Sequence, residues 1–354
     1  MDSEHCSAWQ HHSEVSETLT MSYILAPCLS LVSAKTRELQ ATLAGQIARA
    51  LAVFCVDEIV IFDDGQFVHP PNQGGGNNGD SHVSSSNDQP KKYTGYTDPS
   101  YFLAHILSYL ECPPQFRRML FPMHPDLQHA GILPSLDMPH HLKKDEWCQY
   151  REGVAKSGSN TSGSGTTIFT GLEPKLSVAL KQNIPENTRV TLNLGLEKAS
   201  QLPAGSSRAW KGAAAVAPSQ PREDKGLYWG YTVRTAESLS AVMTECPFDG
   251  GYDLTFGTSE RGQPVQDFQR GGSDEADLPQ FDHMLIVFGG VAGLEAAVKA
   301  DKELEKLKVR APETLFDYWV NVVPGQGSRT MRTEEAVWVG LTALRGVALA
   351  KGRD

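Results

Sequence analysis

The sequence predicts an α/β protein built on a parallel sheet, with a smaller β-rich module inserted into it. Apolar runs with the length of buried strands alternate with helical patterns toward both ends of the chain, an order that favours parallel sheets. Residues 151–225 interrupt this order with short β-type runs between Gly, Ser, Thr and Pro. The 354 residues, 40% of them hydrophobic, are enough for two domains.

The composition excludes several classes of protein. No run of 18 apolar residues is present, and residues 1–20 are polar and acidic, without the basic start and apolar centre of a signal peptide. We therefore expect neither secretion nor a membrane span. The six cysteines are scattered without a CxxC pair, which fits a reducing compartment. A formal net charge of −10 means that any polyanion must be bound by local basic residues.

The first part of the α/β domain is predicted in residues 21–150, after a disordered acidic tail at 1–20. Apolar residues indicate a strand at Met21–Leu31 and a buried strand at Val56–Asp64, and four-residue spacing predicts a helix at Thr36–Ala52 between them. Residues 65–90 have almost no apolar content and are expected to be a flexible loop. A further helix is predicted at Tyr101–Leu110, before Pro113 and Pro114.

The inserted module at 151–225 differs in texture and in charge. It has short strand-like runs, such as LSVAL and RVTLNLGL, which suggest a small β-barrel. Ten Lys or Arg stand against six Asp or Glu, a net charge of +4 in a chain of −10. This reversal fits either an ordinary solvated surface or a nucleic-acid-binding module of OB type.

Three predicted strands of the last part, residues 226–354, lead into Gly- or hydroxyl-rich turns. They follow a strand at Leu227–Arg234 and a helix at Ala236–Glu245. The turns are Gly257–Gly262 after YDLTF, Gly289–Gly293 after HMLIVF, and NVVPGQGSRT (Asn321–Thr330) after the run LFDYWV. Ligands of open α/β sheets bind beyond the carboxyl ends of the strands, so the three turns are expected to line one small-molecule crevice.

The final helix is predicted from about Thr333 to Leu349. Thr333 is the expected N-cap, with Glu334 and Glu335 in the first turn. Apolar residues cover more of its circumference than one core-facing stripe requires. Small residues, among them Gly340, would let another helix approach, so the pattern fits either a subunit interface or a helix buried in its own domain.

Familiar catalytic motifs do not match. GGVAG lacks the G-x-G-x-x-G spacing of dinucleotide sites, and neither a P-loop nor a G-x-S-x-G nucleophile elbow is present. His140 and His141, like the pair His124 and His129, have no acidic or Cys companion at metal spacing. We therefore expect no metal site, and we expect Cys246 to be structural.

Four long motifs, GLYWGYTVR, GYDLTFGTSERG, HMLIVFGG and NVVPGQGSRTMRTEEA, together closely resemble the SPOUT-class RNA methyltransferases. The branch is that of the eukaryotic SPOUT-domain-containing methyltransferases and their archaeal relatives. The similarity extends through Thr42–Asp63 and Leu107–His141. This resemblance implies an α/β fold whose C-terminal part forms a deep trefoil knot, an exception to the rule against threading. It also implies an OB-like insert, S-adenosyl-L-methionine bound in the knot, and a homodimer.

The resemblance further implies roles for individual residues. Arg261 is expected to face the cofactor carboxylate or an RNA phosphate, with a surface ion pair to Glu260 or Asp253 as the alternative. Glu334 could help remove a uridine N3 proton, or it could simply complement the helix dipole. The expected cofactor-binding residues are Thr258, Ser259, Glu260, Arg261, Gly289, Gly290, Asn321, Pro324, Gly325, Gln326, Gly327, Ser328 and Thr330. The expected RNA-binding residues are Lys175, Lys181, Arg189, Arg208, Lys211 and Arg329.

Two functions follow from the resemblance. The first is an S-adenosylmethionine-dependent methyltransferase that modifies a base of large-subunit ribosomal RNA, with uridine N3 as the candidate atom and S-adenosyl-L-homocysteine as the product. It would act in the nucleus or nucleolus. The alternative is a non-catalytic or dual-role scaffold, binding RNA or protein at the mitotic spindle or kinetochore, that retains the cofactor pocket.

Overall fold

The computed structural model describes residues 21–25, 34–66, 98–156, 165–172, 177–195, 213–269, 278–290 and 292–352. The predicted tail at 1–20 and most of the predicted loop at 65–90 lie outside these residues. In the part of the chain that is described, no helix combines the length and the apolar character needed to cross a membrane.

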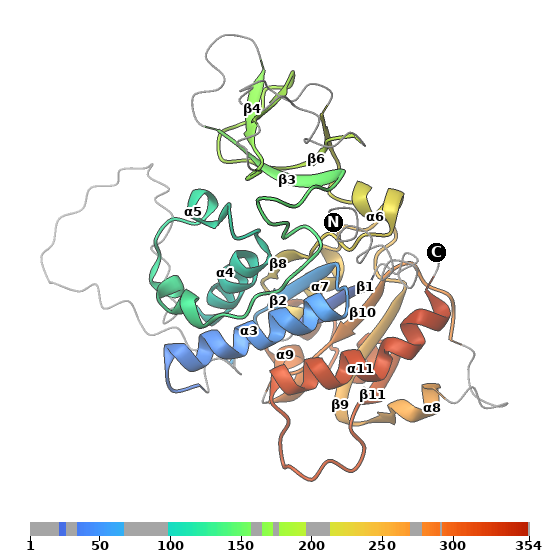
Figure 1. Ribbon diagram of the computed structural model, residues 1–354. Helices are drawn as coiled ribbons and strands as arrows, with labels where there is room; N and C mark the ends of the chain where they lie inside the picture. Colours follow the sequence, from blue (N-terminus) through green and yellow to red (C-terminus); the bar gives the residue numbers. More distant parts are fainter. Residues whose placement is uncertain are drawn as a thin grey trace, which may run out of the picture.

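A six-stranded parallel sheet forms the centre of the larger module (Figure 1). Its strand order is β11-β9-β10-β1-β2-β8, and each neighbouring pair is parallel. The strands are β1 (Met21–Leu25), β2 (Glu58–Phe62), β8 (Thr232–Ala236), β9 (Leu254–Pro264), β10 (Met284–Val287) and β11 (Tyr318–Asn321). The parallel α/β fold predicted from the alternation of apolar runs is thus present.

Helices connect these strands and pack against them. Helix α3 contacts both α4 and α11, and α3 and α11 cross the same face of the sheet in Figure 1. The longer helices are α3 (Arg37–Val53), α4 (Pro99–Glu111), α9 (Gly293–Ala300) and α11 (Thr333–Lys351). The shorter ones are α5 (Arg117–Leu120), η1 (Pro125–Ile132), α6 (Gln220–Lys225), α7 (Leu239–Thr244), α8 (Val265–Gln269), α10 (Lys302–Lys306) and η3 (Pro312–Leu315).

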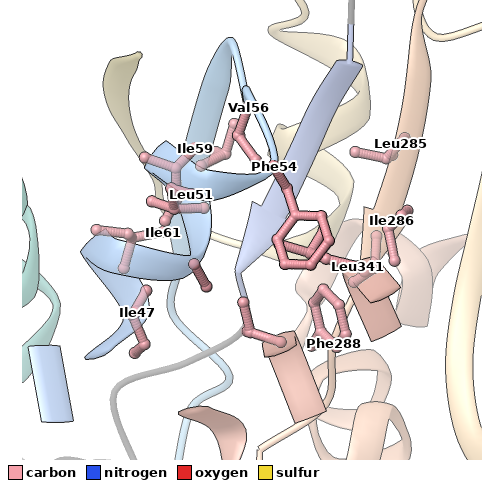
Figure 2. Close-up of a cluster of buried hydrophobic side chains, with 14 of the residues drawn as sticks. Ile47, Leu51, Phe54, Val56, Ile59, Ile61, Leu285, Ile286, Phe288 and Leu341 are labelled. Atoms are coloured by element: carbon pink, nitrogen blue, oxygen red, sulfur yellow. The ribbon is translucent and has the colours of Figure 1, made fainter. Parts of the chain in front are cut away.

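The main core lies between the sheet and these helices. Every residue of β2 and of β10 is buried, as strands covered on both faces require. Figure 2 shows Ile47 and Leu51 of α3 close to Ile59 and Ile61 of β2, and Leu341 of α11 close to Phe288. Burial of these side chains supplies most of the driving force that holds the helices on the sheet.

A second sheet stands at one end of the molecule, at the top of Figure 1. It is antiparallel, with the order β5-β4-β3-β6-β7. Its strands are β3 (Tyr150–Ala155), β4 (Thr166–Phe169), β5 (Ser177–Leu180), β6 (Arg189–Asn193) and β7 (Ala214–Val216). They bury a separate apolar cluster that includes Ile168, Val178 and Leu192. The five strands lie between Tyr150 and Val216, within the stretch where the texture of the sequence changes.

One predicted strand is placed wrongly. Leu227–Arg234 was expected to be a strand, whereas β8 begins only at Thr232. Gly230 has φ +98°, which glycine adopts readily. This positive φ is incompatible with an extended strand, so β8 can begin only after Gly230. The aromatic residues before β8 are buried and anchor the segment instead: the Tyr228 hydroxyl donates to Val56 O, and the Tyr231 hydroxyl donates to Leu107 O.

Candidate functional site

The carboxyl ends of β9, β10 and β11 meet at one edge of the parallel sheet. Trp319 of β11 pairs with Gly257 of β9, but the next residue, Val320, pairs with Gln263. Residues 258–262 therefore bulge out of the ladder. A turn was expected at Gly257–Gly262, whereas the chain remains in strand β9 up to Pro264 and leaves the ladder only as a bulge.

Two polar side chains tie this bulge to its neighbours. The Thr258 hydroxyl donates to Val287 O, 3.0 Å away, at the end of β10. The Asn321 side-chain amide donates to Glu260 O at 2.8 Å, and its carbonyl oxygen accepts the Val323 N–H at 3.0 Å. Asn321 thus joins the bulge to the loop after β11, so the structure brings two of the three predicted turns together.

The loop after β11 is held by bonds within itself. The Gln326 N–H donates to Val323 O at 3.2 Å, and the Ser328 hydroxyl donates to Thr330 O at 2.9 Å. Gly325 has φ +75°, which favours glycine. A side chain added at Gly327 would meet no atom within 4 Å, so in the described chain the space beside this glycine is open to a ligand. Pro324 and Arg329 are exposed on the same loop.

Two glycines allow the close approach of backbone on which the edge depends. A Cβ at Gly262 would lie 2.3 Å from the Val320 carbonyl carbon, and one at Gly289 would lie 2.9 Å from Leu294 N in the first turn of α9. Real Cβ atoms do not approach that closely, so neither position accepts a side chain. Gly290 follows directly, and its carbonyl oxygen accepts the Gly293 N–H. The segment Gly289–Gly290, from the remaining predicted turn, therefore packs tightly against the start of α9.

Arg261 lies at the exposed tip of the bulge. Its side chain is 76% exposed, and Nη1 lies 3.5 Å from Glu295 Oε1. The alternative partners considered from sequence were Glu260 and Asp253, but Asp253 instead accepts the backbone N–H groups of Asp282 and His283. An exposed ion pair of this kind contributes little to stability, so Arg261 is accessible to an anionic ligand.

Glu334 is buried, and in the described part of the chain its Oε2 atom has no hydrogen-bond partner. It lies in the first turn of α11, where the N-terminal end of the helix dipole favours a negative charge. The expected N-cap, Thr333, is instead the first helical residue, and Arg332 is the N-cap. The N-cap lies one residue earlier than expected, because the Glu335 side chain accepts the Arg332 N–H at 3.0 Å. A carboxylate with an unused oxygen thus directly follows the loop.

The predicted RNA-binding residues differ in their surroundings. Lys181 is exposed, and Lys175, Arg208 and Lys211 lie outside the described residues. Arg189 is not a free surface cation: Nη2 donates to Glu111 Oε1 at 3.0 Å and Nε donates to Glu152 Oε2 at 2.5 Å. These two carboxylates occupy its guanidinium, so we assign Arg189 a structural role.

Glu111 is the centre of a buried polar cluster that the sequence analysis missed. This α4 residue pairs with Arg189 of β6 and with His140 at 3.0 Å, so the cluster joins helix α4 to the second sheet. Burial alone would raise the pKa of Glu111, but the charge of Arg189 and the hydrogen bond with His140 outweigh it and lower that pKa to about 2. Arg189 is 78 residues away in the chain, and no local pattern signals the pair.

The expectation that His124 has no acidic companion is wrong. His124 Nδ1 and His105 Nδ1 each lie 3.0 Å from Asp126 Oδ2. The sequence analysis passed over this group because His105 belongs to α4, about twenty residues before the other two. His129 faces a different carboxylate, that of Glu38, at 3.8 Å.

The family model described as "Putative RNA methyltransferase" matches residues 22–344, nearly the whole chain. This chain belongs to that family. Among its relatives are proteins named 28S rRNA (uridine-N(3))-methyltransferase from Mus musculus and Homo sapiens, each 44% identical over 326 residues. The match covers 91% of this chain and 75% or 77% of those relatives. A protein of the same name from Drosophila melanogaster is 41% identical over 91% of this chain and 61% of its own length.

Membership of the RNA methyltransferase family confirms the family resemblance read from the four motifs. The relatives are enzymes by name, so the expectation of an enzyme is also confirmed. All four motifs lie within the matched range, and three of them form the strand-edge site described above.

Proposed function

We propose that this chain transfers a methyl group from S-adenosyl-L-methionine to N3 of a uridine in 28S ribosomal RNA, and that it acts in the nucleus or nucleolus. The names of its relatives support the substrate and the atom. The single structural observation that supports the cofactor site is Asn321, which joins the β9 bulge to the open loop after β11. The scaffold alternative is not favoured, because the relatives are named for an activity.

The path of the C-terminal segment supports the proposed trefoil knot. The chain passes from β9 to β10 and then back to β11 on the other side of β9. It next returns across the sheet, since Trp338 Nε1 of α11 donates to Gln46 O of α3 at 3.2 Å. A segment that crosses back over its own earlier strands in this way has the course that threading requires. For the second sheet, its five antiparallel strands support an OB-like barrel, which has the same number of strands.

The site has features that fit S-adenosylmethionine. The bulge at 258–262, Gly289–Gly290 and the loop at 324–330 contain several glycines, and Gly327 has open space beside it. Val287 and Val320, near the ends of β10 and β11, are fully buried, so the strands behind this edge are apolar, which suits a ligand with apolar parts. When bound, the cofactor would supply an electrophilic methyl group on a sulfonium.

The chain's own residues would then position the target and remove its proton. Asn321 and Thr258 hold the three strand ends in fixed relation, which supplies the alignment that such a transfer needs. A uridine N3 carries a proton that must leave before the product is neutral. We assign Glu334 Oε2 as the acceptor, because it is buried without a partner in the described chain and directly follows the loop.

RNA would approach along exposed cations around this edge and on the insert. Arg261 is largely exposed, and Arg329 and Lys181 are exposed. We retain Lys175, Arg208 and Lys211 as proposed phosphate contacts from the positive charge of the insert. In a chain of net charge −10, binding through such local groups weakens steeply with added salt.

We also propose that the active unit is a homodimer, on the resemblance to the family. The pattern of α11 no longer supports it by itself. Val337 and Gly340 are buried in this chain's own core, and Trp338 packs edge-on against Phe54 with ring centroids 5.8 Å apart. Charged substitutions at Val337 or Gly340 would therefore unfold the chain rather than separate subunits. Light scattering of the unmodified protein tests the dimer directly.

The experiment compares wild type with Asn321→Ala in two measurements. Calorimetry gives the affinity for S-adenosyl-L-homocysteine, and mass spectrometry of nucleosides detects N3-methyluridine in 28S RNA from cells that lack the activity. Loss of the two hydrogen bonds that hold the bulge to the loop should disorder the proposed site and weaken cofactor binding at least about tenfold. Asn183→Ala is the control, because Asn183 is exposed on the insert, away from the edge. If wild type forms no N3-methyluridine, the proposed reaction is refuted; if Asn321→Ala binds normally, the site is misplaced.

A further inference from the structure

Three side chains from two elements converge away from the strand-edge site. His105 lies within α4, His124 precedes η1, and Asp126 lies in the first turn of η1. The carboxylate oxygen Asp126 Oδ2 lies 3.0 Å from Nδ1 of each histidine, and one ligand atom from each of the three residues lies within 4.8 Å of the others. Two imidazoles and one carboxylate therefore face a common point.

This donor set matches a borderline divalent metal ion. Imidazole and carboxylate groups both bind Zn²⁺ at about 2.0–2.2 Å, so neighbouring ligand atoms of a tetrahedral site lie about 3.3 Å apart. The two nitrogen-to-oxygen separations of 3.0 Å need only a few tenths of an ångström of adjustment, and all three ligand atoms lie within 4.8 Å of one another. The same ligands bind Co²⁺, Ni²⁺ and Cu²⁺ in the usual order of affinity.

Packing holds the ligands in place and leaves one side of the site open. The Asp126 side chain is fully buried, whereas those of His105 and His124 are 22% and 24% exposed. The His105 ring stacks on Phe121 with an interplanar angle of 22°, and His124 meets His105 edge-on with centroids 4.9 Å apart. The carboxylate is thus anchored on the core side, and water can reach the fourth position from the histidine side.

We propose that His105, His124 and Asp126 bind one Zn²⁺ ion, which fastens η1 to α4 and keeps one coordination position for water. The ion would neutralise the Asp126 carboxylate, which is otherwise a buried charge. Segment 124–136 also bonds to α3, through Arg37 to Pro125 O and Arg49 to Leu136 O. The metal would therefore stabilise the contact of η1 with both helices, and it takes no part in methyl transfer.

The competing role for His124 is that of a helix cap. Its Nδ1 also accepts the Asp126 N–H at 3.2 Å, and this contact uses the lone pair that a metal would take. In that arrangement the three residues form a hydrogen-bonded group without an ion. The two arrangements differ in one measurable property, which is saturable binding of one Zn²⁺ per chain.

The test uses the full chain, stripped with a chelator and titrated with ZnCl₂ by calorimetry. We expect one site with a Kd below about 10 µM and a higher Tm with Zn²⁺ present. Substitution by Co²⁺ should produce the visible absorption bands of a four-coordinate ion. His105→Gln and Asp126→Asn should each weaken binding at least about tenfold. His129→Gln is the matched control, since this nearby histidine faces Glu38 instead, and it should bind as wild type does.

Two results would overturn the proposal. One is wild-type protein that shows no saturable Zn²⁺ binding up to about 100 µM, which would identify the hydrogen-bonded cap. The other is binding of unchanged affinity in His105→Gln and Asp126→Asn, which would place the ion elsewhere. Neither result bears on the methyltransferase proposal, because that proposal is judged by nucleoside products and by cofactor affinity.

Discussion

Replacing Glu111 by Gln removes the charge at the centre of the buried cluster that joins helix α4 to the second sheet. Gln has almost the same shape, so no cavity forms. It leaves the Arg189 guanidinium with the Glu152 carboxylate alone, and it places an amide against His140. Breaking one side of a buried ion pair is costly, because the remaining charge loses its compensation.

The magnitude follows from the pKa of Glu111. Its value falls from 4.5 in the unfolded chain to about 2 in the folded protein. At about 1.4 kcal/mol for each pKa unit, the ionised carboxylate stabilises the fold by about 3 kcal/mol at pH 7. For a chain of 354 residues we expect Glu111→Gln to lower the Tm by about 4 °C.

The pH dependence has a definite sign. The folded pKa is lowered, so the contribution is fully present above about pH 4.5 and is lost as the pH falls toward about 2. At pH 3, between the two pKa values, about half of it remains. The difference in stability between wild type and Glu111→Gln should therefore shrink by about half between pH 7 and pH 3. Other carboxylates titrate in both proteins and cancel in the comparison.

The assay is thermal unfolding of wild type, Glu111→Gln and the control Glu303→Gln at both pH values. Glu303 forms an exposed ion pair with Lys306, three residues on, and its side chain is 65% exposed. Its loss should change stability by no more than about 0.5 kcal/mol. The reasoning is refuted if Glu111→Gln melts with the control at pH 7, or if its deficit is the same at pH 3.

Two further predictions concern glycines near the site. A Cβ at Gly340 would lie 2.5 Å from Phe288 Cε1, so Gly340→Ala should destabilise the fold by about 1–3 kcal/mol in urea unfolding. Gly346→Ala, in open space on the same helix, should raise stability by up to about 1 kcal/mol, and equal effects of the two changes would contradict the packing argument. Gly327→Val should leave the Tm unchanged but weaken S-adenosyl-L-homocysteine binding at least about tenfold in calorimetry; an unchanged affinity would exclude this loop from the cofactor site.

Local patterns predicted most of the α/β module. Val56–Asp64 was predicted as a buried strand, and β2 runs from Glu58 to Phe62 with every residue buried. The helix predicted at Thr36–Ala52 is α3, Arg37–Val53. These elements follow from the sequence because strand and helix periodicity depend on residues only two to four positions apart.

The candidate site was predictable in composition but not in geometry. The sequence indicated three glycine-rich segments after three strands, and family membership supports their shared function. It did not indicate the bulge at 258–262, because a bulge depends on the register with β11, which lies some sixty residues later. Nor did it indicate that Asn321 would join the bulge to the last loop.

By itself, then, the sequence determined the fold class, the β-rich insert and the family, since each rests on local pattern or on motif similarity. Tertiary structure alone decided which side chains meet. It paired Arg189 with Glu111 across 78 residues, directed Gly340 toward Phe288 of its own core, and placed His105 beside Asp126. The physical reason is that such contacts arise from closure of the chain around a common core, where partners are selected by packing and burial rather than by distance along the sequence.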